Sequence, residues 1–404
     1  MRPCTRAVIV AAMAAFPGVI HAQRTKEPKR PSLEAGADTN DAHAYYDFAV
    51  ASLKRDPEKA ADALYWATRL EPTWADAYYA RRIALLLSEP RRLSRYWSGD
   101  RRTIQSKEIK QIDSLFYYAL TLNPFVSQRL DRLLFESVVD QFAREYSNAG
   151  GLASDARYAV DREIASWPAA DRAWLAYGEG RTDEALRLYA EAIHSDKKNG
   201  PLRVDRARIF YNRGDVDSAL VELTAAIEDL RKRDKKDLIY VYQSKALAEH
   251  SLAVVQQALG HTDAAKEAFG RALQEDLSYF PAHLQLGFMA LGAKDTTTAL
   301  SEMDLATQLR GDDAVARYVY GFTLASAGKA AEAEPQLRKA IELDPVFAAP
   351  HFILGQVLEQ TKRTADAVTQ YTIFLAGSAK NDLRREQAQA RVAALGAGSG
   401  ELTR

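Results

Sequence analysis

The stretch AVARYVYGFTLASAGKAAEAEPQLRKAIELDPVF, residues 314–347, contains two runs of helical spacing joined by a short turn. Small residues, Gly321 and Ala333, stand where two helices would cross, and the bulky Leu337 follows four residues after the alanine. Small residues let helices approach closely, and a bulky residue fills the space that remains. Gly328 separates the runs, where a left-handed residue ends a helix. The stretch therefore predicts a helical hairpin.

The alanine of the second run recurs at a nearly constant interval. Successive positions are 34, 46, 34, 34 and 34 residues apart, and they are Ala185, Ala219, Ala265, Ala299, Ala333 and Ala367. Twelve residues before each alanine the chain has a small residue: Ala173, Ala207, Ala253, Gly287, Gly321 and Gly355. A period this short is typical of repeat proteins built from one supersecondary unit.

Three further columns keep the same register. Four residues after each alanine stands a bulky residue: Tyr189, Leu223, Phe269, Met303, Leu337 and Tyr371. Seven residues after it the residue is small in five of six units, with Phe374 as the exception. Five residues before it stand Gly180, Gly214, Gly260, Lys294, Gly328 and Lys362, at the expected helix end. Helix N-caps are expected soon after, at Thr182, Asp215, Thr262 and Thr296.

These columns resemble the tetratricopeptide-repeat family, whose unit is a helix–turn–helix of 34 residues. The residues that carry the resemblance in the best unit are Tyr320, Gly321, Leu324, Ala333, Leu337, Ala340 and Pro345. The resemblance implies an all-α fold, an α-solenoid of about eight or nine stacked helix pairs. It also implies a non-catalytic scaffold or adaptor, because such repeats mostly build binding surfaces.

The pattern weakens toward the N-terminus, which suggests a division of the chain. Residues 127–168 are expected to form either a degenerate repeat or a helical pair outside the repeat. The expected segments are a signal peptide at 1–22, a flexible leader at 23–40, divergent repeats at 41–168 with an insertion near 88–107, a regular array at 169–379, a capping helix at 380–395 and a disordered tail at 396–404.

The first 22 residues have the pattern of a secretory signal. Arg2 and Arg6 precede an apolar run at 7–20, and a small residue, Ala22, stands before the expected cut. Cleavage predicts a periplasmic or secreted bacterial protein with no membrane span and no cysteine, because Cys4 is the only cysteine. A short signal anchor that stays attached is the alternative.

The composition and motifs favour a binding protein. Lys and Arg together number 54, equal to Asp and Glu, whereas a nucleic-acid-binding domain is usually basic. The chain lacks the two-histidine zinc motif, a glycine-rich phosphate loop and a Gly-x-Ser-x-Gly nucleophile elbow. We therefore expect no catalytic, metal or cofactor site and a protein or peptide partner in the envelope. An enzyme with an unrecognised site among residues 127–170 is a further alternative.

The resemblance also implies where a partner would bind. Inward-facing residues of the family lie on the first helix of each pair, and here they include Arg208, Tyr211, Phe288, Tyr318, Phe322, Phe352 and Gln356. The asparagine column that holds a peptide carboxylate in some members is occupied by other residues, so that clamp is absent. An aromatic groove with a few amides suits an extended or helical peptide. The alternative is that some of these aromatic residues pack against the neighbouring repeat.

The insertion supplies a second candidate surface. It contains Arg91, Arg92, Arg95, Tyr96 and Trp97, and arginine with aromatic residues is typical of interface anchors. These residues predict a second protein contact or, as an alternative function, binding of a glycan, lipid or other anionic polymer. The opposing interpretation is a loop that packs on its own repeat, with Trp97 as a plug.

Overall fold

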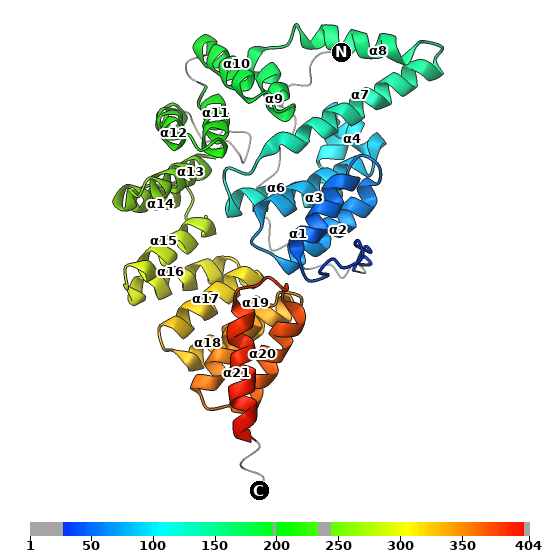
Figure 1. The fold of residues 1–404 in the computed structure, drawn as a ribbon. Helices are drawn as coiled ribbons and strands as arrows, with labels where there is room; N and C mark the ends of the chain where they lie inside the picture. The colour runs from blue at the N-terminus through cyan, green and yellow to red at the C-terminus, as the bar shows by residue number, and fades with distance from the viewer. Residues whose placement is uncertain (1–26, 197–198, 233–243, 400–404) are drawn as a thin grey trace. The chain divides into compact units, whose positions relative to one another are not determined.

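The computed structural model describes residues 27–196, 199–232 and 244–399, and within these ranges the chain consists of helices and turns without a strand. This confirms the predicted all-α solenoid fold. The chain divides into two compact units (Figure 1). Of the described residues, one unit contains 52–61, 75–196, 199–232 and 244–277, and the other contains 27–51, 62–74 and 278–399. The predicted signal peptide lies outside the described residues.

The first unit contains the divergent N-terminal helices and the first regular pairs. Its helices are α3 (Ala75–Leu87), α4 (Pro90–Trp97), α5 (Arg101–Ile104), α6 (Lys107–Leu122), α7 (Asp131–Asn148), α8 (Ala153–Ile164), α9 (Ala169–Gly178), α10 (Thr182–Ser195), α11 (Gly200–Asn212), α12 (Val216–Arg231), α13 (Lys245–Ala258) and α14 (Thr262–Glu275). A short 3-10 helix, η2 (Gln128–Leu130), precedes α7.

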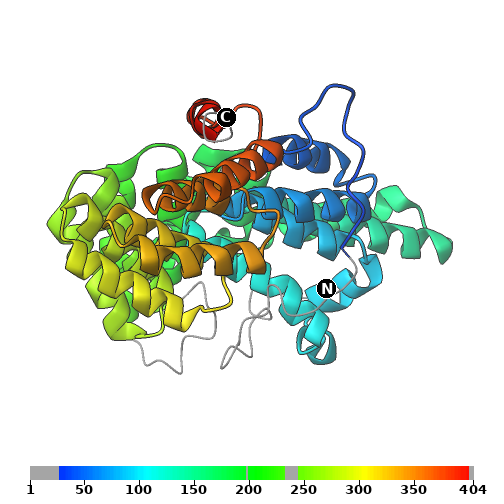
Figure 2. The ribbon, with the colours of Figure 1, turned by 90° about the horizontal axis from the view of Figure 1, so that it is seen from below.

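The second unit joins the N-terminal segment to the last repeats. It contains α1 (Ala42–Ser52), α15 (Phe280–Gly292), α16 (Thr296–Leu309), α17 (Ala314–Ser326), α18 (Ala330–Leu343), α19 (Ala349–Gln360), α20 (Thr364–Gly377) and α21 (Arg384–Ser399). The helix α2 (Pro57–Leu70) contributes its first turn to one unit and the rest to the other. Figure 2 shows the last repeats, drawn in yellow to red, as helices lying side by side in chain order.

The helix crossings follow the columns of the sequence. All six recurring alanines are fully buried. A Cβ atom placed on Gly321 would lie 2.8 Å from Cγ of Leu337, and one on Gly355 would lie 2.7 Å from Cε1 of Tyr371. Both distances are shorter than real Cβ contacts, so the helices of these two pairs approach as closely as they do because the residue is glycine.

The turn column is also confirmed. Each of its six residues has a positive φ angle: Gly180, Gly214, Gly260, Lys294, Gly328 and Lys362. The two lysines adopt φ 61°, a conformation that costs energy for a residue with a Cβ atom. The fold therefore imposes the left-handed turn even where the sequence does not supply glycine.

The predicted N-caps were correct at Asp215, whose carboxylate accepts a hydrogen bond from the Ser218 amide at 3.2 Å. They were wrong by one position at Thr182, Thr262 and Thr296, which are the first residues inside α10, α14 and α16. The cap comes directly after the left-handed residue, so in α16 it is Asp295, which accepts from the Thr298 amide at 3.1 Å.

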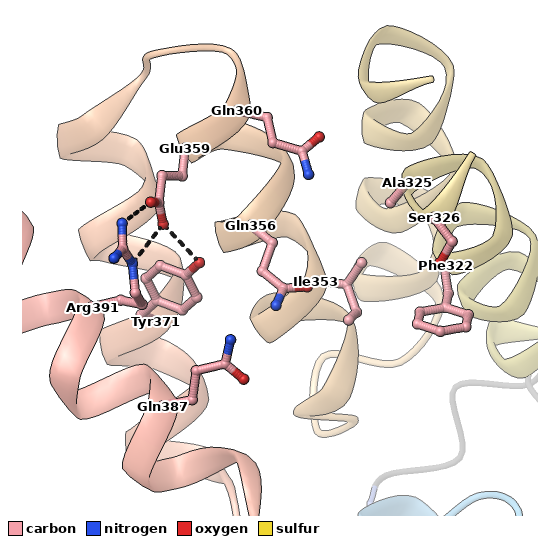
Figure 3. A pocket seen from close by; sticks show the side chains of 10 residues that line it. All are labelled: Phe322, Ala325, Ser326, Ile353, Gln356, Glu359, Gln360, Tyr371, Gln387 and Arg391. Atoms are coloured by element: carbon pink, nitrogen blue, oxygen red, sulfur yellow. Dashed lines mark hydrogen bonds and ion pairs between the residues drawn. The ribbon is translucent and has the colours of Figure 1, made fainter. Parts of the chain in front are cut away.

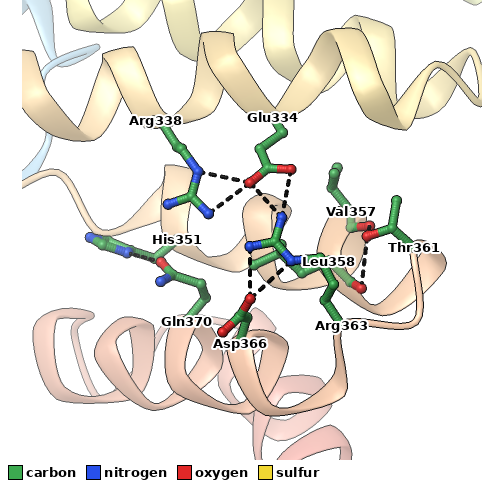
Figure 4. A network of polar contacts seen from close by, with 9 residues as sticks. All are labelled: Glu334, Arg338, His351, Val357, Leu358, Thr361, Arg363, Asp366 and Gln370. Atoms are coloured by element: carbon green, nitrogen blue, oxygen red, sulfur yellow. Dashed lines mark hydrogen bonds and ion pairs between the residues drawn. The ribbon is translucent and has the colours of Figure 1, made fainter.

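Polar contacts tie consecutive pairs together at the surface (Figure 4). Glu334 on α18 accepts hydrogen bonds from Nη1 of Arg363, at the start of α20, at 2.9 and 3.0 Å. Arg363 also donates to Asp366 at 2.7 Å, and Arg338 donates to Glu334 at 2.8 Å. Burial alone would raise the pKa of Glu334, but these two arginines outweigh it and lower that pKa. The network fixes the register between neighbouring repeats.

The insertion near 88–107 is helical rather than loop-like, because it contains α4 and α5. Tyr96 is buried, and its hydroxyl accepts a hydrogen bond from Arg82 at 3.1 Å and donates to Asp113 at 3.1 Å. The buried Arg82 itself donates to Asp113 at 3.0 Å. This network ties α4 to α3 and α6, so Tyr96 is corrected from a partner contact to a structural residue.

The segment expected as a flexible leader has contacts within the second unit where it is described. The Trp66 indole donates to the Pro28 carbonyl at 3.1 Å, and the Asn40 amide donates to the Ala376 carbonyl at 2.8 Å. The Lys380 amide donates to Asp38 at 2.6 Å. Residues 27–40 thus follow a defined path beside α2 and the end of α20.

A buried ion pair reinforces this connection. Nε of Arg69 on α2 donates to both carboxylate oxygens of Asp344 at 2.8 and 2.9 Å, although 275 residues separate them in sequence. Nη1 of Arg69 also donates to Glu27 at 2.9 Å. Burial works against the charge of Arg69, but the bonds with Asp344 prevail and raise its pKa.

Candidate functional site

The last repeats of the second unit enclose a cavity of about 510 Å³ (Figure 3). It lies between the first helices of two consecutive pairs, α17 and α19, and it is bordered by α20 and the terminal helix α21. Its lining residues are Phe322, Ala325, Ser326, Ile353, Gln356, Glu359, Gln360, Tyr371, Gln387 and Arg391. This volume falls in the range of cavities that bind ligands.

The one carboxylate of the lining is neutralised within the cavity wall. Nε of Arg391 donates to Oε2 of Glu359 at 3.0 Å, and the second guanidinium nitrogen contacts Oε1. The Tyr371 hydroxyl also donates to Oε2 of Glu359, at 3.2 Å. Burial raises the pKa of Tyr371 to about 12, so this hydroxyl stays protonated at neutral pH. The cavity therefore offers no uncompensated charge to a ligand.

The remaining polar groups of the lining are neutral. Gln356 and Gln360 lie on α19, Gln387 lies on α21, and none of the three side chains has a hydrogen-bond partner among the described residues. Each amide carries both a donor and an acceptor, which matches the N–H and C=O groups of a peptide backbone. Phe322 and Ile353 supply an apolar wall beside them (Figure 3).

The groove residues predicted from the sequence divide into lining and packing residues. Phe322 and Gln356 line the cavity. Phe288 is exposed but does not belong to the lining. Tyr318 is half-buried and packs edge-on against Phe347, with ring centroids 5.1 Å apart. The sequence thus identified two of the ten lining residues.

Phe352 is corrected to a core residue. It is buried, and its ring lies 5.2 Å from Phe374 and 5.9 Å from Tyr371, measured between centroids. Phe374 is the exception in the otherwise small column, and its ring takes the space beside Phe352. These two contacts are with α20, the second helix of the same pair, and not with the neighbouring repeat that the alternative named.

The two predicted groove residues of α11 lie in the first unit. Arg208 is buried and binds Asp205 on its own helix at 2.8 Å, so it is corrected to a structural residue. Tyr211 stacks on Phe125, with ring centroids 3.9 Å apart. Neither side chain borders the cavity of the last repeats.

The insertion exposes fewer anchors than expected. Arg91 and Arg95 are exposed, whereas Arg92 pairs with Glu108 and donates to the Leu85 carbonyl at 3.2 Å. Trp97 packs between Phe135 and Trp174, with centroid distances of 6.2 and 6.0 Å. Arg92 thus holds the insertion on α3 and α6, whereas Trp97 packs on α7 and α9 and not on the insertion's own repeat.

Several lining residues were missed by sequence reasoning. Tyr371 was recognised only as a packing residue, and its hydroxyl faces Glu359. Gln387 and Arg391 belong to α21, which was expected only to cap the array. Their spacing of four residues places both on one face of the helix. That spacing points to a shared binding surface only once the groove is known to end at that helix.

Among the described residues, no group of three or more His, Cys, Asp or Glu side chains could hold a metal ion. None of the helices in the described ranges is both long and apolar enough to cross a membrane.

Comparison with known proteins supports the repeat assignment. Family models described as tetratricopeptide repeat match residues 176–238 and 323–382. Protein O-mannosyl-transferase Tmtc1 of Drosophila melanogaster is 33% identical over 107 residues, which cover 24% of this chain and 12% of that protein. The chain therefore spans about an eighth of that relative.

Solved structures show the same kind of similarity. The structure of YrrB, described as a TPR protein with an unusual peptide-binding site, is 20% identical, with a TM-score of 0.40 over 50% of this chain and 97% of that chain. PilF of Pseudomonas aeruginosa is 19% identical, with a TM-score of 0.38 over 51% of this chain and 93% of that chain. Taken with the crossings and turns of the repeat, the family matches lead to one assignment. The chain belongs to the tetratricopeptide-repeat family.

Proposed function

We propose that the protein is a non-catalytic scaffold that binds an extended, uncharged segment of a partner protein in the cavity of its last repeats. The matches to tetratricopeptide-repeat models support the role of a protein-interaction scaffold, and this fold is typical of proteins without catalytic activity. The observation that carries the finer proposal is the cavity between α17, α19 and α21, with its three unpaired glutamines.

The chemistry of the cavity favours a backbone-directed contact. The glutamine amides can pair with peptide groups of an extended segment whatever its side chains, while Phe322 and Ile353 accept a small apolar side chain. A charged side chain would lose hydration without gaining an opposite charge, because Glu359 is already paired with Arg391. We therefore expect neutral peptides to bind better than acidic or basic ones.

Binding can be tested with a synthetic library of short peptides and the purified chain, measured by fluorescence anisotropy. Gln387→Glu and Gln356→Glu each place a new carboxylate at the cavity. Each change should lower the affinity for the neutral peptides by about tenfold or more, the equivalent of about 1.4 kcal/mol. Gln389→Glu is the matched control, because Gln389 is exposed on the same helix as Gln387 and does not line the cavity.

Two results would count against the cavity as the site. One is equal weakening by the cavity variants and by Gln389→Glu, which would indicate a charge effect only. The other is normal peptide binding by both cavity variants in folded form.

The alternative function, binding of an anionic glycan, lipid or other polymer, rests on exposed arginines of the insertion, including Arg91 and Arg95. Salt separates the two functions, because binding of a polyanion weakens steeply with ionic strength and a neutral groove responds little. If Arg91→Ser with Arg95→Ser abolishes capture of heparin beads while the cavity variants capture normally, the alternative is favoured.

We further propose that the scaffold acts in the bacterial envelope as a periplasmic or secreted protein. This proposal is supported by Arg2, Arg6 and the apolar run at 7–20 in the sequence. N-terminal sequencing of the protein from an envelope fraction should begin near Gln23, and a cytosolic chain that still carries Met1 would contradict it.

A further inference from the structure

The helix α8 has one covered face. It packs on α7, where Ala156 is its one buried residue and Arg157 pairs with Asp140. At its start and middle, Leu152 is 65% exposed and Tyr158 is 70% exposed, although both are large and apolar. The face of α8 turned away from α7 is therefore available for a partner.

Two opposite charges flank Tyr158 on this face. Asp155 lies three residues before Tyr158 and Arg162 lies four residues after it, so all three fall on one side of the helix. Asp155 and Arg162 are both exposed, and within the described part of the chain neither forms an ion pair with another residue. The charges on this side are thus free to meet a complementary surface.

The face is complementary to itself. If a second α8 lies antiparallel, with a two-fold axis passing between Tyr158 and Ala159, Asp155 of each copy meets Arg162 of the other. The same register places the small Ala159 opposite Tyr158, which leaves room for the ring. A two-fold axis makes each contact twice, as in any isologous dimer.

We propose that the protein self-associates through α8, as an antiparallel pair of helices from two copies of the chain. The partner is a second copy because the order along this face is acidic, aromatic and basic. When a second helix runs in the opposite direction, its basic residue meets the acidic residue of the first, and its acidic residue meets the basic one. Opposite charges at the two ends fix the antiparallel register, since a parallel pair would bring like charges together.

The interface is small, which sets the expected strength. The helix has 12 residues and is about 18 Å long at 1.5 Å per residue. A contact of this length buries less than the roughly 1,000 Å² typical of stable interfaces. We therefore expect a weak, concentration-dependent dimer that weakens further with salt.

Sedimentation velocity of the full chain over a concentration series tests the proposal. Asp155→Arg places a new guanidinium against Arg162 of the second copy, and Arg162→Asp puts two aspartates together, so each variant alone should associate at least about tenfold more weakly than wild type. Glu163→Arg is the control, because Glu163 lies on α8 about 80° around the helix from Asp155 and about 140° from Tyr158, and this change should leave the dimer unchanged.

Mixing the two variants gives the decisive measurement. In a homodimer of either variant, like charges meet at both ends of the helix pair. In a heterodimer of the two variants, each end instead brings an arginine against an aspartate, so the heterodimer should form more readily than either homodimer. Asp155 and Arg162 also complement the dipole of α8, and each variant loses that effect. The mixture contains the same altered helices, so a gain in association cannot arise from helix stability.

Three results would overturn the proposal. They are a wild-type chain that stays monomeric up to about 1 mM, single variants that associate like wild type, and a mixture no more associated than its separate components. Circular dichroism confirms that each variant is folded, which the exposure of all the substituted side chains favours.

Discussion

The pair α17–α18 and the pair α7–α8 are both helical hairpins, but they bury very different amounts of apolar surface. The former buries Val315, Val319, Leu324, Ala333 and Leu337, among others. The longer α7 and α8 together bury three residues, Leu134, Ala143 and Ala156. Similar local structure therefore conceals a difference in tertiary support.

The difference lies in the neighbours of each pair. The pair α17–α18 has helices packed on both sides, α16 before it and α19 after it. By contrast, α8 packs on α7 and has no comparable second neighbour among the described helices. Because most helical stability in proteins comes from packing of an apolar face, we expect α7–α8 to open at a lower free energy than α17–α18.

The largest effect is expected at a close crossing. Gly321→Leu should destabilise the protein by about 3 kcal/mol, because the added side chain would collide with Leu337. The control is Gly270→Leu, also within a helix, since a Cβ atom on Gly270 meets nothing within 4 Å. That change should be neutral or stabilise by up to about 1 kcal/mol.

Urea unfolding measures both variants, and hydrogen exchange localises the loss to α17–α18. Equal destabilisation by the two leucines would mean that the loss comes from the residue type and not from the crossing.

A second effect depends on pH and is confined to a regular pair. Burial lowers the pKa of His250, on α13, to about 4. The unfolded chain takes up this proton near pH 6.5, so stability is complete above that pH and is lost as the pH falls toward 4, by about 3 kcal/mol. His250→Leu should reduce the difference in unfolding free energy between pH 6.5 and 4 by that amount.

Hydrogen exchange sharpens this test, because α7–α8 serves as an internal control. In wild type, acidification from pH 6.5 to 4 should reduce protection in α13–α14 more than in α7–α8, after correction for the intrinsic exchange rate. If wild type and His250→Leu lose stability equally over this range, the histidine is not the cause.

The smallest effect concerns the turn column. Lys294→Gly removes the conformational cost of φ 61° at a residue with a Cβ atom, which stabilises the folded protein. Glycine also increases the conformational entropy of the unfolded chain, which offsets part of this stabilisation. The net stabilisation should be about 0.5 kcal/mol. The reverse change, Gly328→Lys at φ 75°, should cost a similar amount. Thermal unfolding detects both, and shifts of the same sign would contradict the explanation.

The fold was predictable because a period repeats one contact many times. The residue at Gly321 meets the residue 16 positions later, Leu337, and the same spacing joins Gly355 to Tyr371. One well-formed unit thus defines the crossing in the others. The N-caps were less predictable, since a one-residue shift of Thr296 relative to Asp295 leaves the column pattern unchanged.

The site was less predictable because it depends on departures from the repeat. Phe352 occupies an inward-facing position of the family, and it is buried because the unusual Phe374 packs beside it. Gln387 and Arg391 come from α21, outside the repeat, so no column assigns them a partner. The pairing of Arg391 with Glu359 appears only when the two helices are placed together.

The ion pair between Arg69 and Asp344 has a consequence for how the chain is made. At about 5–20 residues per second, the ribosome adds Asp344 roughly 14 to 55 seconds after Arg69. During that interval the arginine of α2 lacks its buried partner. The second unit therefore cannot form its buried ion pair until most of the chain has been made.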